Sequence, residues 1–325
     1  MRALESELGA ALTGLAREGL ARRRRTVEAS GPGHRVTVDG RACVSFCSTN
    51  YLGLAGDPRV AAALRDGAKR WGCGAGAAHL VTGHTTAHHE LETALAEFTG
   101  RPRALLFSTG YMANLGVVTA LAGREDFIAE DRLTHASLID AARLAGATVR
   151  RYGHADPAAA AARLGASRAR RRLLVTDGIF SMDGDAAPLT ALADAAAAND
   201  ATLIVDDAHG LGITGPGGRG SVAAAGLTTA EVPALVGTLG KACGTFGAFV
   251  AGSEALVETL IHRARTYIYT TAPPPAVAAA TLTALATVVA DDWRRDRQAA
   301  LVARYRRGAR EAGLRLAPSD SPIQP

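Results

Sequence analysis

The feature that most constrains the fold is a repeated alternation of short apolar strands with helical patterns between residues 87 and 263. Such alternation favours a mainly parallel sheet covered by helices. We therefore predict a large α/β domain with a seven-stranded sheet. The predicted strands are residues 104–107, 126–129, 148–152, 172–176, 202–205, 234–236 and 248–251.

The segments on either side of this alternation have different patterns. Residues 2–25 predict an amphipathic helix ended by a break at 30–33, and two strands, 34–38 and 43–47, are joined by an Asp39-Gly40 turn. Residues 58–71 predict a further helix. One long helix from 273 to about 312 and a strand at 314–317 begin a small α+β domain that we expect to be incomplete at Pro325. We divide the chain into residues 1–54, 55–272 and 273–325.

Composition excludes several classes of protein. The net charge of +5 comes from dispersed arginines, and aromatic residues make up 5% of the chain, which argues against a nucleic-acid surface. The N-terminus lacks the apolar core of a signal peptide, and residues 272–290 predict a buried helix, not a membrane span. The four cysteines form no CxxC pair, so we expect small buried thiols in a reducing compartment. We therefore expect a cytoplasmic protein.

Lys241 is the residue that stands out for chemistry. The chain has only two lysines, and Lys69 occupies a polar position in a helical pattern. Lys241 instead follows a short apolar run, within Val-Gly-Thr-Leu-Gly-Lys-Ala. Arginine cannot replace a reactive amine, because it stays protonated and forms no imine. Cys243 lies nearby, but no adjacent His or Asp activates it, so we expect a packing role.

Other polar residues follow the predicted strands, at the sheet edge where open α/β sheets bind ligands. The helix start after Ser108 suits a phosphate or is an ordinary cap. His135 is a ligand contact or a cap, and Ser181 lies in an acidic turn. Asp206 ends a buried strand, so its carboxylate needs a partner, and His209 follows it. The two could instead be metal ligands.

An aspartate, a histidine and an isolated lysine at strand ends indicate pyridoxal phosphate. The aspartate would hold the protonated pyridine nitrogen, the histidine a ring oxygen, and the lysine would form an imine. The glycine-rich residues 72–86 either let the backbone approach a ligand or simply connect two helices.

Five motifs together resemble the α-oxoamine synthases, pyridoxal-phosphate enzymes of the aspartate aminotransferase fold (fold type I). They are Asn50-Tyr-Leu-Gly-Leu54, Thr134-His-Ala-Ser-Leu138, Phe180-Ser-Met-Asp-Gly-Asp185, Asp206-Asp-Ala-His-Gly210 and Thr238-Leu-Gly-Lys241. The resemblance covers essentially the whole chain, in order.

The resemblance implies roles for individual residues. Lys241 would bind the cofactor covalently and act as the acid–base group, and Asp206 would hold the pyridine nitrogen. His209 and Ser181 would hold the phenolic oxygen, and His135 would stack on the ring and contact substrate. The residues implied at the cofactor phosphate are Gly110, Tyr111 and Thr238, with Thr270 and Thr271 reaching the phosphate of the neighbouring subunit. The implied assembly is a homodimer with the active site at its interface, and Arg22 and Asn50 would contact substrate.

The Asp-Asp-Ala-His-Gly form resembles most the branch that condenses L-alanine with pimeloyl-CoA or a pimeloyl carrier protein in biotin synthesis. The implied reaction is decarboxylative and releases CO2 and a free thiol. The alternatives are an α-oxoamine synthase that uses glycine or serine, a non-catalytic cofactor-binding homologue, and, more distantly, a metal hydrolase. The chain departs from the family at Ala78, where a hydroxyl residue is usual. The resemblance also implies a longer C-terminal part, with a substrate-contacting Thr and a carboxylate-binding Arg.

Overall fold

The computed structural model describes residues 2–30 and 34–325 and divides the chain into two compact units, Met1–Ser48 and Thr49–Pro325. For Arg2, Ala29 and Ser30 only the backbone is described. The predicted break at residues 30–33 falls mainly on Gly31, Pro32 and Gly33, outside the described residues. The predicted division into three domains stays a prediction.

The first unit contains one helix and a three-stranded antiparallel sheet in the order β1-β2-β3. Its elements are α1 (Arg2–Arg17), β1 (Val27–Ser30), β2 (Arg35–Val38) and β3 (Arg41–Val44). The predicted helix to residue 25 is too long, because Gly19 takes φ +70° and the Leu20 amide donates to the Leu15 carbonyl at 2.8 Å, which ends the helix.

The predicted Asp39-Gly40 turn is present in this sheet, with φ +49° and +76°, the left-handed pair of a two-residue hairpin. The next strand therefore begins at once, at Arg41, so the predicted strand 43–47 was placed too late. Strand β1 was missed by the sequence prediction. Its pairing with β2 contains an irregularity between Val27 and Ala29.

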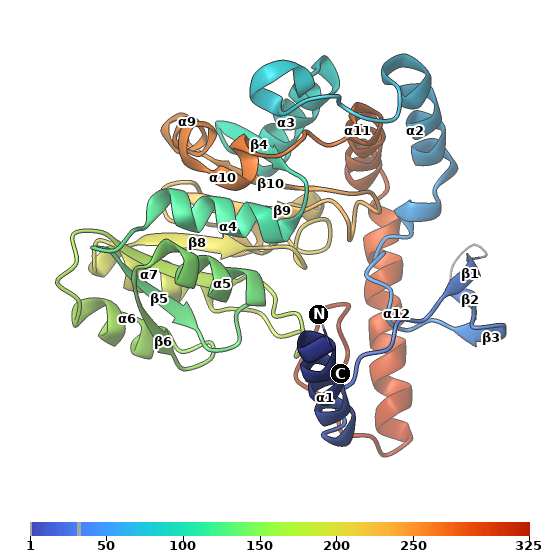
Figure 1. Ribbon diagram of the computed structural model, residues 1–325, viewed down its shortest axis with the longest axis horizontal. Helices are drawn as coiled ribbons and strands as arrows, with labels where there is room; N and C mark the ends of the chain where they lie inside the picture. Colours follow the sequence, from blue (N-terminus) through green and yellow to red (C-terminus); the bar gives the residue numbers. More distant parts are fainter. Residues whose placement is uncertain (1, 31–33) are drawn as a thin grey trace. The chain divides into compact units, whose positions relative to one another are not determined.

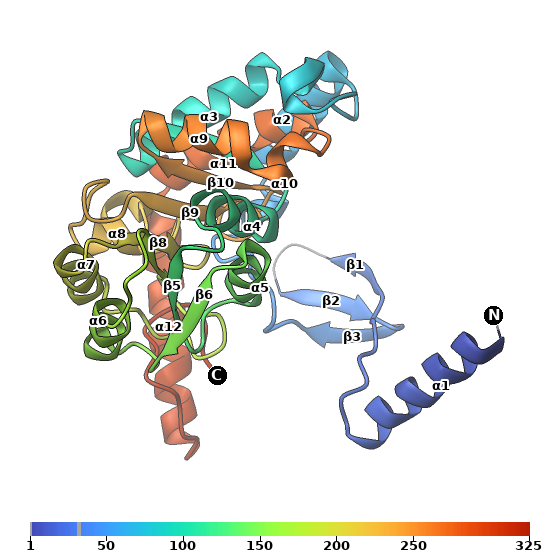
Figure 2. The same cartoon turned by 60° about the vertical axis from the view of Figure 1, so that its left-hand side comes forward.

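The second unit is built on a seven-stranded sheet in the order β4-β10-β9-β8-β7-β5-β6 (Figures 1 and 2). Only β10 is antiparallel to its neighbours β4 and β9, so the prediction of a mainly parallel seven-stranded sheet is confirmed. The strands are β4 (Arg103–Phe107), β5 (Phe127–Asp131), β6 (Thr148–Tyr152), β7 (Arg172–Asp177), β8 (Thr202–Asp206), β9 (Ala234–Thr238) and β10 (Ala248–Gly252).

Alternate side chains of the central strands enter two different core layers, so both faces of the sheet are buried. Val175 and Ile204 pack in one layer, while Leu174 and Leu203 pack in the other, and all four are fully buried. Burying each such side chain contributes about 1.5–3 kcal/mol.

Two sets of helices cover these faces (Figure 2). Those of the first layer are α4 (Gly110–Leu121), α5 (Ala136–Ala145), α9 (Glu254–Arg263) and α10 (Arg265–Ile268). Those on the opposite side are α2 (Pro58–Trp71), α3 (Thr86–Thr99), α6 (Pro157–Gly165), α7 (Leu189–Ala198), α8 (Ser221–Ala224) and α11 (Pro275–Ala290).

The C-terminal region differs from the prediction of one long helix. Helix α11 is followed by α12 (Asp292–Glu311), and the two are bent by 72°. Between them Asp291 leaves helical geometry and accepts hydrogen bonds from Arg59 at 2.7 Å and Arg294 at 3.1 Å. The predicted strand at 314–317 is wrong, because no strand lies beside it within the described sheets.

As predicted for residues 272–290, α11 is a largely buried helix. Over residues 2–30 and 34–325, no single helix is long and apolar enough to cross a membrane, and α11 and α12 meet that criterion only as a bent pair.

Candidate active site

The carboxyl ends of β7, β8 and β9 meet at one edge of the sheet. Asp177 pairs with Asp206 across β7 and β8, and Asp206 pairs with Val236 across β8 and β9. Thr238 ends β9, three residues before Lys241. The parallel topology therefore gathers polar residues that are far apart in the sequence, at the edge where such sheets bind ligands.

A tight loop between β9 and β10 holds Lys241. The Leu239 amide donates to the Gly247 carbonyl at 2.9 Å, and the Gly244 amide donates to the Lys241 carbonyl at 2.9 Å. Gly244 has φ +66°, and a Cβ there would lie 2.2 Å from the Ala55 amide nitrogen. This position therefore requires glycine for its conformation and for its close contact.

A hydrogen-bond chain starts at the Lys241 amine. Its Nζ lies 2.8 Å from Nε2 of His209, and Nδ1 of His209 lies 2.7 Å from the Tyr51 hydroxyl. Burial, with the nearby charge of Lys241, lowers the pKa of His209 to about 3, so its ring is neutral. Both ring nitrogens have partners, which argues against His209 as a metal ligand.

The environment of Lys241 favours a free amine. Burial lowers its pKa, and the charges of Asp206 and Asp177 offset part of this effect. Among the described ion pairs, none joins Nζ to a carboxylate. Even a partly buried ammonium without an ion pair is costly, so losing its proton or forming a covalent bond relieves that cost.

Asp206 is held by donors from two elements. Its Oδ2 accepts a hydrogen bond from Nδ2 of Asn114 at 2.6 Å, and its Oδ1 accepts one from the Ala208 amide at 3.0 Å. Asn114 also donates to Oγ of Ser137 at 2.8 Å, and Ser137 Oγ lies 2.6 Å from Nδ1 of His135. These contacts link Asp206 to His135 through α4 and α5.

Asp177 is a second buried carboxyl group beside Asp206. It accepts hydrogen bonds from the Thr134 hydroxyl at 2.8 Å and from the His135 amide at 3.2 Å. Burial and the charge of Asp206 raise the pKa of Asp177. The two hydrogen bonds to Asp177 fix the backbone that carries His135.

The N-terminus of α4 offers an anion-binding position. The Thr109 side chain caps the Met112 amide at 3.1 Å, which leaves the first-turn amides of Gly110 and Tyr111 without helical partners. A Cβ at Gly110 would meet open space. The Tyr111 phenol itself points to Asp140, to whose carboxylate it donates.

Thr238 forms local contacts at the end of β9. Its hydroxyl donates to the Gly247 carbonyl at 3.2 Å and accepts from the Gly240 amide at 3.4 Å. To donate to a phosphate, the Thr238 hydroxyl must give up its hydrogen bond to the Gly247 carbonyl.

The other predicted site residues include Ser181, Asn50 and Arg22, and Ser181 has no described hydrogen bond to Lys241, His209 or Asp206. Ser181 lies in a turn where the Phe180 amide donates to the Asp185 carbonyl at 2.9 Å. Asn50 accepts from the Ala55 amide at 3.1 Å. Arg22 belongs to the unit of residues 1–48, so its contact with an acyl substrate stays a prediction.

Thr270 and Thr271 follow α10 and lie next to the glycine-rich segment. Thr271 forms an antiparallel bridge with Ala78, and the Ala272 amide donates to the Ala77 carbonyl at 3.0 Å. The glycine-rich segment is thus paired with the residues that were predicted to reach a neighbouring subunit.

Sequence reasoning missed four residues of this arrangement: Tyr51, Asn114, Ser137 and Asp177. Tyr51 and Ser137 were present in the quoted motifs but carried no assigned role. A usable signal existed for Asn114, which is polar within the otherwise apolar helix 110–121, and for Asp177, which ends a buried strand as Asp206 does.

The expectation of buried cysteines holds for one residue only. Cys43, Cys47 and Cys73 are exposed, two of them in the first unit and one in the glycine-rich segment. Cys243 is buried, and burial raises the pKa of its thiol to about 12, so it is protonated at neutral pH and packs as a small apolar group.

Among the residues that the structure describes, one group of side chains has the spacing of a metal site, His154 with Asp183 and Asp185. The His154 ring already bridges Asp131 at 3.0 Å and Asp185 at 2.9 Å. Burial lowers the pKa of His154, but these two carboxylates outweigh burial and raise it. The arrangement is that of a histidine held between two carboxylates, which favour its protonated form.

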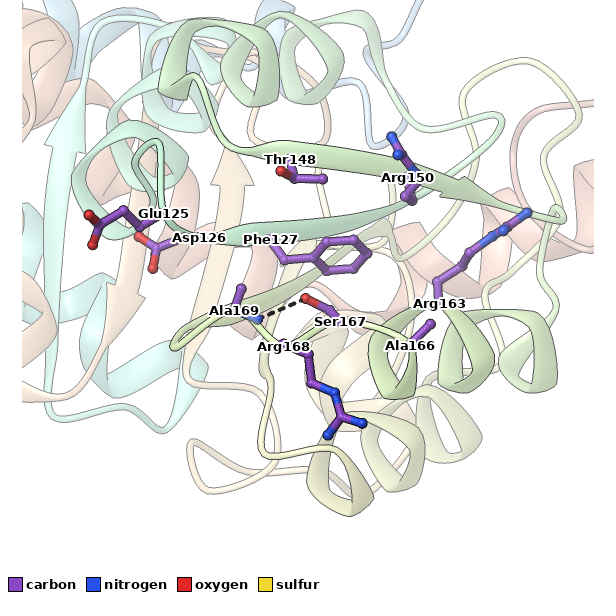
Figure 3. Close-up of a pocket in the computed structure, with 10 residues that line it drawn as sticks. All are labelled: Glu125, Asp126, Phe127, Thr148, Arg150, Arg163, Ala166, Ser167, Arg168 and Ala169. Carbon is purple, nitrogen blue, oxygen red and sulfur yellow. Dashed lines mark hydrogen bonds between the residues drawn. The ribbon is translucent and has the colours of Figure 1, made fainter.

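A cavity of about 370 Å³ lies at the opposite, amino-terminal ends of β5 and β6 (Figure 3). Arg150 and Arg163 stand at one end of it, and Glu125 and Asp126 at the other. It contains none of the predicted site residues.

Comparison with known proteins agrees with this geometry. Residues 41–325 match the model of the aminotransferase class I and II family. The chain is 60% identical over 309 residues to 8-amino-7-oxononanoate synthase of Nitrosococcus oceani, covering 95% of this chain and 81% of that protein.

Two solved structures are similar to this chain. A serine palmitoyltransferase variant from S. paucimobilis, solved with a bound PLP–myriocin aldimine, has a TM-score of 0.90 and 31% identity, over 97% of this chain and 80% of that one. The 8-amino-7-oxononanoate synthase of Francisella tularensis has a TM-score of 0.74 and 31% identity, over 86% and 78%. The chain therefore belongs to the aminotransferase class I and II family, with the fold type I architecture, and within it to the α-oxoamine synthases.

Proposed function

We propose that this protein is a pyridoxal-phosphate-dependent acyltransferase that condenses L-alanine with a pimeloyl thioester. The products are 8-amino-7-oxononanoate, CO2 and a free thiol, at the start of biotin ring assembly. The observation that carries the proposal is the partly buried Lys241 amine, hydrogen-bonded to a neutral histidine and gathered with Asp206 at one sheet edge. The 60% identity to a protein named for this product supports it.

The residues present fit pyridoxal phosphate. An aldehyde needs an amine that can lose its proton, and burial of Lys241 supplies one. A pyridine nitrogen needs a fixed carboxylate, and Asp206 is held by two donors. A phosphate needs unpaired amides, and the start of α4 has them, with open space at Gly110.

The cofactor supplies an electron sink that makes the Cα proton of a bound amino acid acidic. Lys241 would hold it covalently through Nζ, Asp206 would face its ring nitrogen, and His135 its ring face. Ser181 and His209 would form hydrogen bonds to its phenolic oxygen. The amides of Gly110 and Tyr111, with the Thr238 hydroxyl, would bind its phosphate.

The chain formed by Tyr51, His209 and Lys241 accommodates both protonation states of the lysine. When Nζ carries its proton, it donates to Nε2 of His209, and Nδ1–H donates to the Tyr51 oxygen. When Nζ is a free base, Tyr51 donates to Nδ1, and Nε2–H donates to Nζ. Lys241 can therefore take a proton from the substrate Cα and return it without leaving a buried charge unsolvated.

An assay with defined substrates tests this function. The purified chain with pyridoxal phosphate, pimeloyl-CoA and L-alanine is expected to release free thiol and to form a product with the mass of 8-amino-7-oxononanoate. Alanine should exceed glycine and L-serine roughly tenfold or more in kcat/KM, because a pocket discriminates one small group by about that factor. Pimeloyl carrier protein, run in parallel, identifies the acyl carrier.

Two results would contradict the proposal. Faster thiol release with glycine or serine would identify another α-oxoamine synthase. Absence of release with every amino acid, while the cofactor stays bound, would identify a cofactor-binding homologue without this activity.

We also propose a homodimer in which Thr270 and Thr271 complete the partner's site. In support, these residues have no described hydrogen bond to Lys241, His209 or Asp206 of their own chain. Co-expressed Lys241→Ala and Thr270→Ala/Thr271→Ala chains, each with its own affinity tag, should recover about a quarter of wild-type activity, because half of the dimers are mixed and each mixed dimer has one intact site. Each variant alone is the control. Mixed dimers without recovered activity would show that the threonines serve their own chain's site.

A further inference from the structure

We propose that Asn114 is a positioning residue that ties the carboxylate of Asp206 to the ring of His135, through Ser137. The inference rests on the proposed cofactor chemistry, because Asp206 would contact the nitrogen of the cofactor ring and His135 would stack on the face of the same ring. Asn114 would contact neither cofactor nor substrate.

The two amide protons of Asn114 are both donated in hydrogen bonds, one to Asp206 and the other to Ser137. Nδ2 donates to Oδ2 of Asp206 at 2.6 Å and to Oγ of Ser137 at 2.8 Å. Asn114 is 1% exposed and Ser137 is fully buried, so water does not compete for either bond. Because the amide is planar, the two donors keep a fixed angle, and Asp206 and Ser137 are oriented together.

The donor in the hydrogen bond between Ser137 and His135 can be identified from the protons that each group has available. Ser137 Oγ accepts from Asn114, so its own proton can be donated to Nδ1 of His135, 2.6 Å away. The Ser137 amide also points to Nδ1, at 3.3 Å. With both donors on Nδ1, this nitrogen acts as the acceptor, and the ring proton lies on Nε2. Asn114 thereby fixes the tautomer of a residue that it does not touch.

The cost of this arrangement favours a functional role. Oδ1 of Asn114 is buried without a hydrogen-bond partner in the described structure, and an unmade buried hydrogen bond lowers stability. Its neighbours on α4, Ala113, Val117 and Val118, are fully buried apolar residues. An apolar side chain at 114 would avoid this cost only by leaving Oδ2 of Asp206 and Oγ of Ser137 without this donor, so the reason for an asparagine lies in these two contacts.

The test measures cofactor binding and a double-mutant cycle on the full chain. Asn114→Leu removes both donors at similar volume, and Ser137→Ala removes only the link to His135. Cofactor affinity is measured by titrating pyridoxal phosphate, and the absorbance spectrum of the bound cofactor is recorded. Thermal melting of the apoprotein reports stability separately. Thr119→Ala, on the same helix with its hydroxyl bonded to the Leu115 carbonyl, is the matched control.

Asn114→Leu is expected to weaken cofactor binding about 10–100-fold and to alter the cofactor spectrum, as for other residues that orient a ligating group. In an Asp206→Asn background, the same change should weaken binding only about two- to threefold, because the partner is already altered. Ser137→Ala should leave cofactor affinity near wild type while lowering kcat.

The inference is overturned if Asn114→Leu lowers only the melting temperature, or if its effect on cofactor affinity is unchanged in the Asp206→Asn background. If Asn114→Leu does not fold, the Ser137→Ala variant tests the proposal in its place. An unchanged kcat in that variant would show that the hydrogen bond between Ser137 and His135 has no role, and it would overturn the proposal. A wild-type chain that binds no pyridoxal phosphate would instead defeat the proposed function itself.

Discussion

Lys241→Ala is expected to abolish both covalent attachment of the cofactor and turnover. Borohydride reduces an imine to a stable secondary amine, so the wild-type chain should gain the mass of the reduced cofactor at the peptide that contains Lys241. The variant has no amine at this position and should gain none. Loss of the same amine as the acid–base group should lower kcat by at least about 10⁴-fold.

The chain supplies its own control for this experiment, because Lys69 is its only other lysine. Lys69 is exposed and pairs with Asp66 at 3.3 Å on α2. Lys69→Ala should therefore keep labelling and activity. Lys241→Arg keeps a positive charge but forms no imine, and it should behave like Lys241→Ala. Reduced cofactor found on Lys69, or on the Lys241→Ala chain at wild-type yield, would refute the role of Lys241.

The second large effect is expected for Asp206→Asn. The amide keeps the size of the carboxylate but removes the charge that would hold a protonated ring nitrogen. Without that charge the ring is a weaker electron sink, and kcat should fall on the order of 10²–10³-fold, the range seen when one electrostatic contact to a developing charge is removed. Steady-state kinetics with alanine and the pimeloyl thioester measure this loss.

Borohydride trapping separates this effect from loss of the cofactor, because Lys241 is intact and labelling should persist. Asp200→Asn is the matched control, since the Asp200 side chain is 96% exposed and precedes the amino end of β8, whereas Asp206 ends that strand. Wild-type kcat in Asp206→Asn, measured with bound cofactor, would show that the ring nitrogen does not depend on this carboxylate.

Local sequence patterns predicted the α/β core well, because they are set by neighbouring residues. The inner strands of the large sheet, such as β5, β7, β8 and β10, are short runs with both faces buried, so their pattern does not depend on which strands lie beside them. The more exposed edge strand β6 also has the predicted bounds of 148–152. The helix at 58–71 also has the predicted bounds, with Asp57 capping one end and Gly72 following the other.

Prediction failed where distant residues decide the local structure. The bend at Asp291 depends on Arg59, which is 232 residues away in the chain. Residues 314–317 have the composition of a strand, but a strand requires a neighbouring strand to satisfy its backbone, and the described sheets offer none there. Helix α1 ended early at Gly19, a local signal that the prediction overlooked.

By itself the sequence determined the fold class, the reactive lysine and the carboxylate at the end of β8. These follow from periodicity, from the rarity of lysine, and from the position of Asp206 after a buried strand. Only the tertiary structure decided what surrounds them. It brought Tyr51 to His209 across 158 positions and Asn114 to Asp206 across 92. The physical reason is that hydrogen bonding and desolvation act through space, so the protonation state of Lys241 and the orientation of Asp206 depend on residues that no local pattern connects to them.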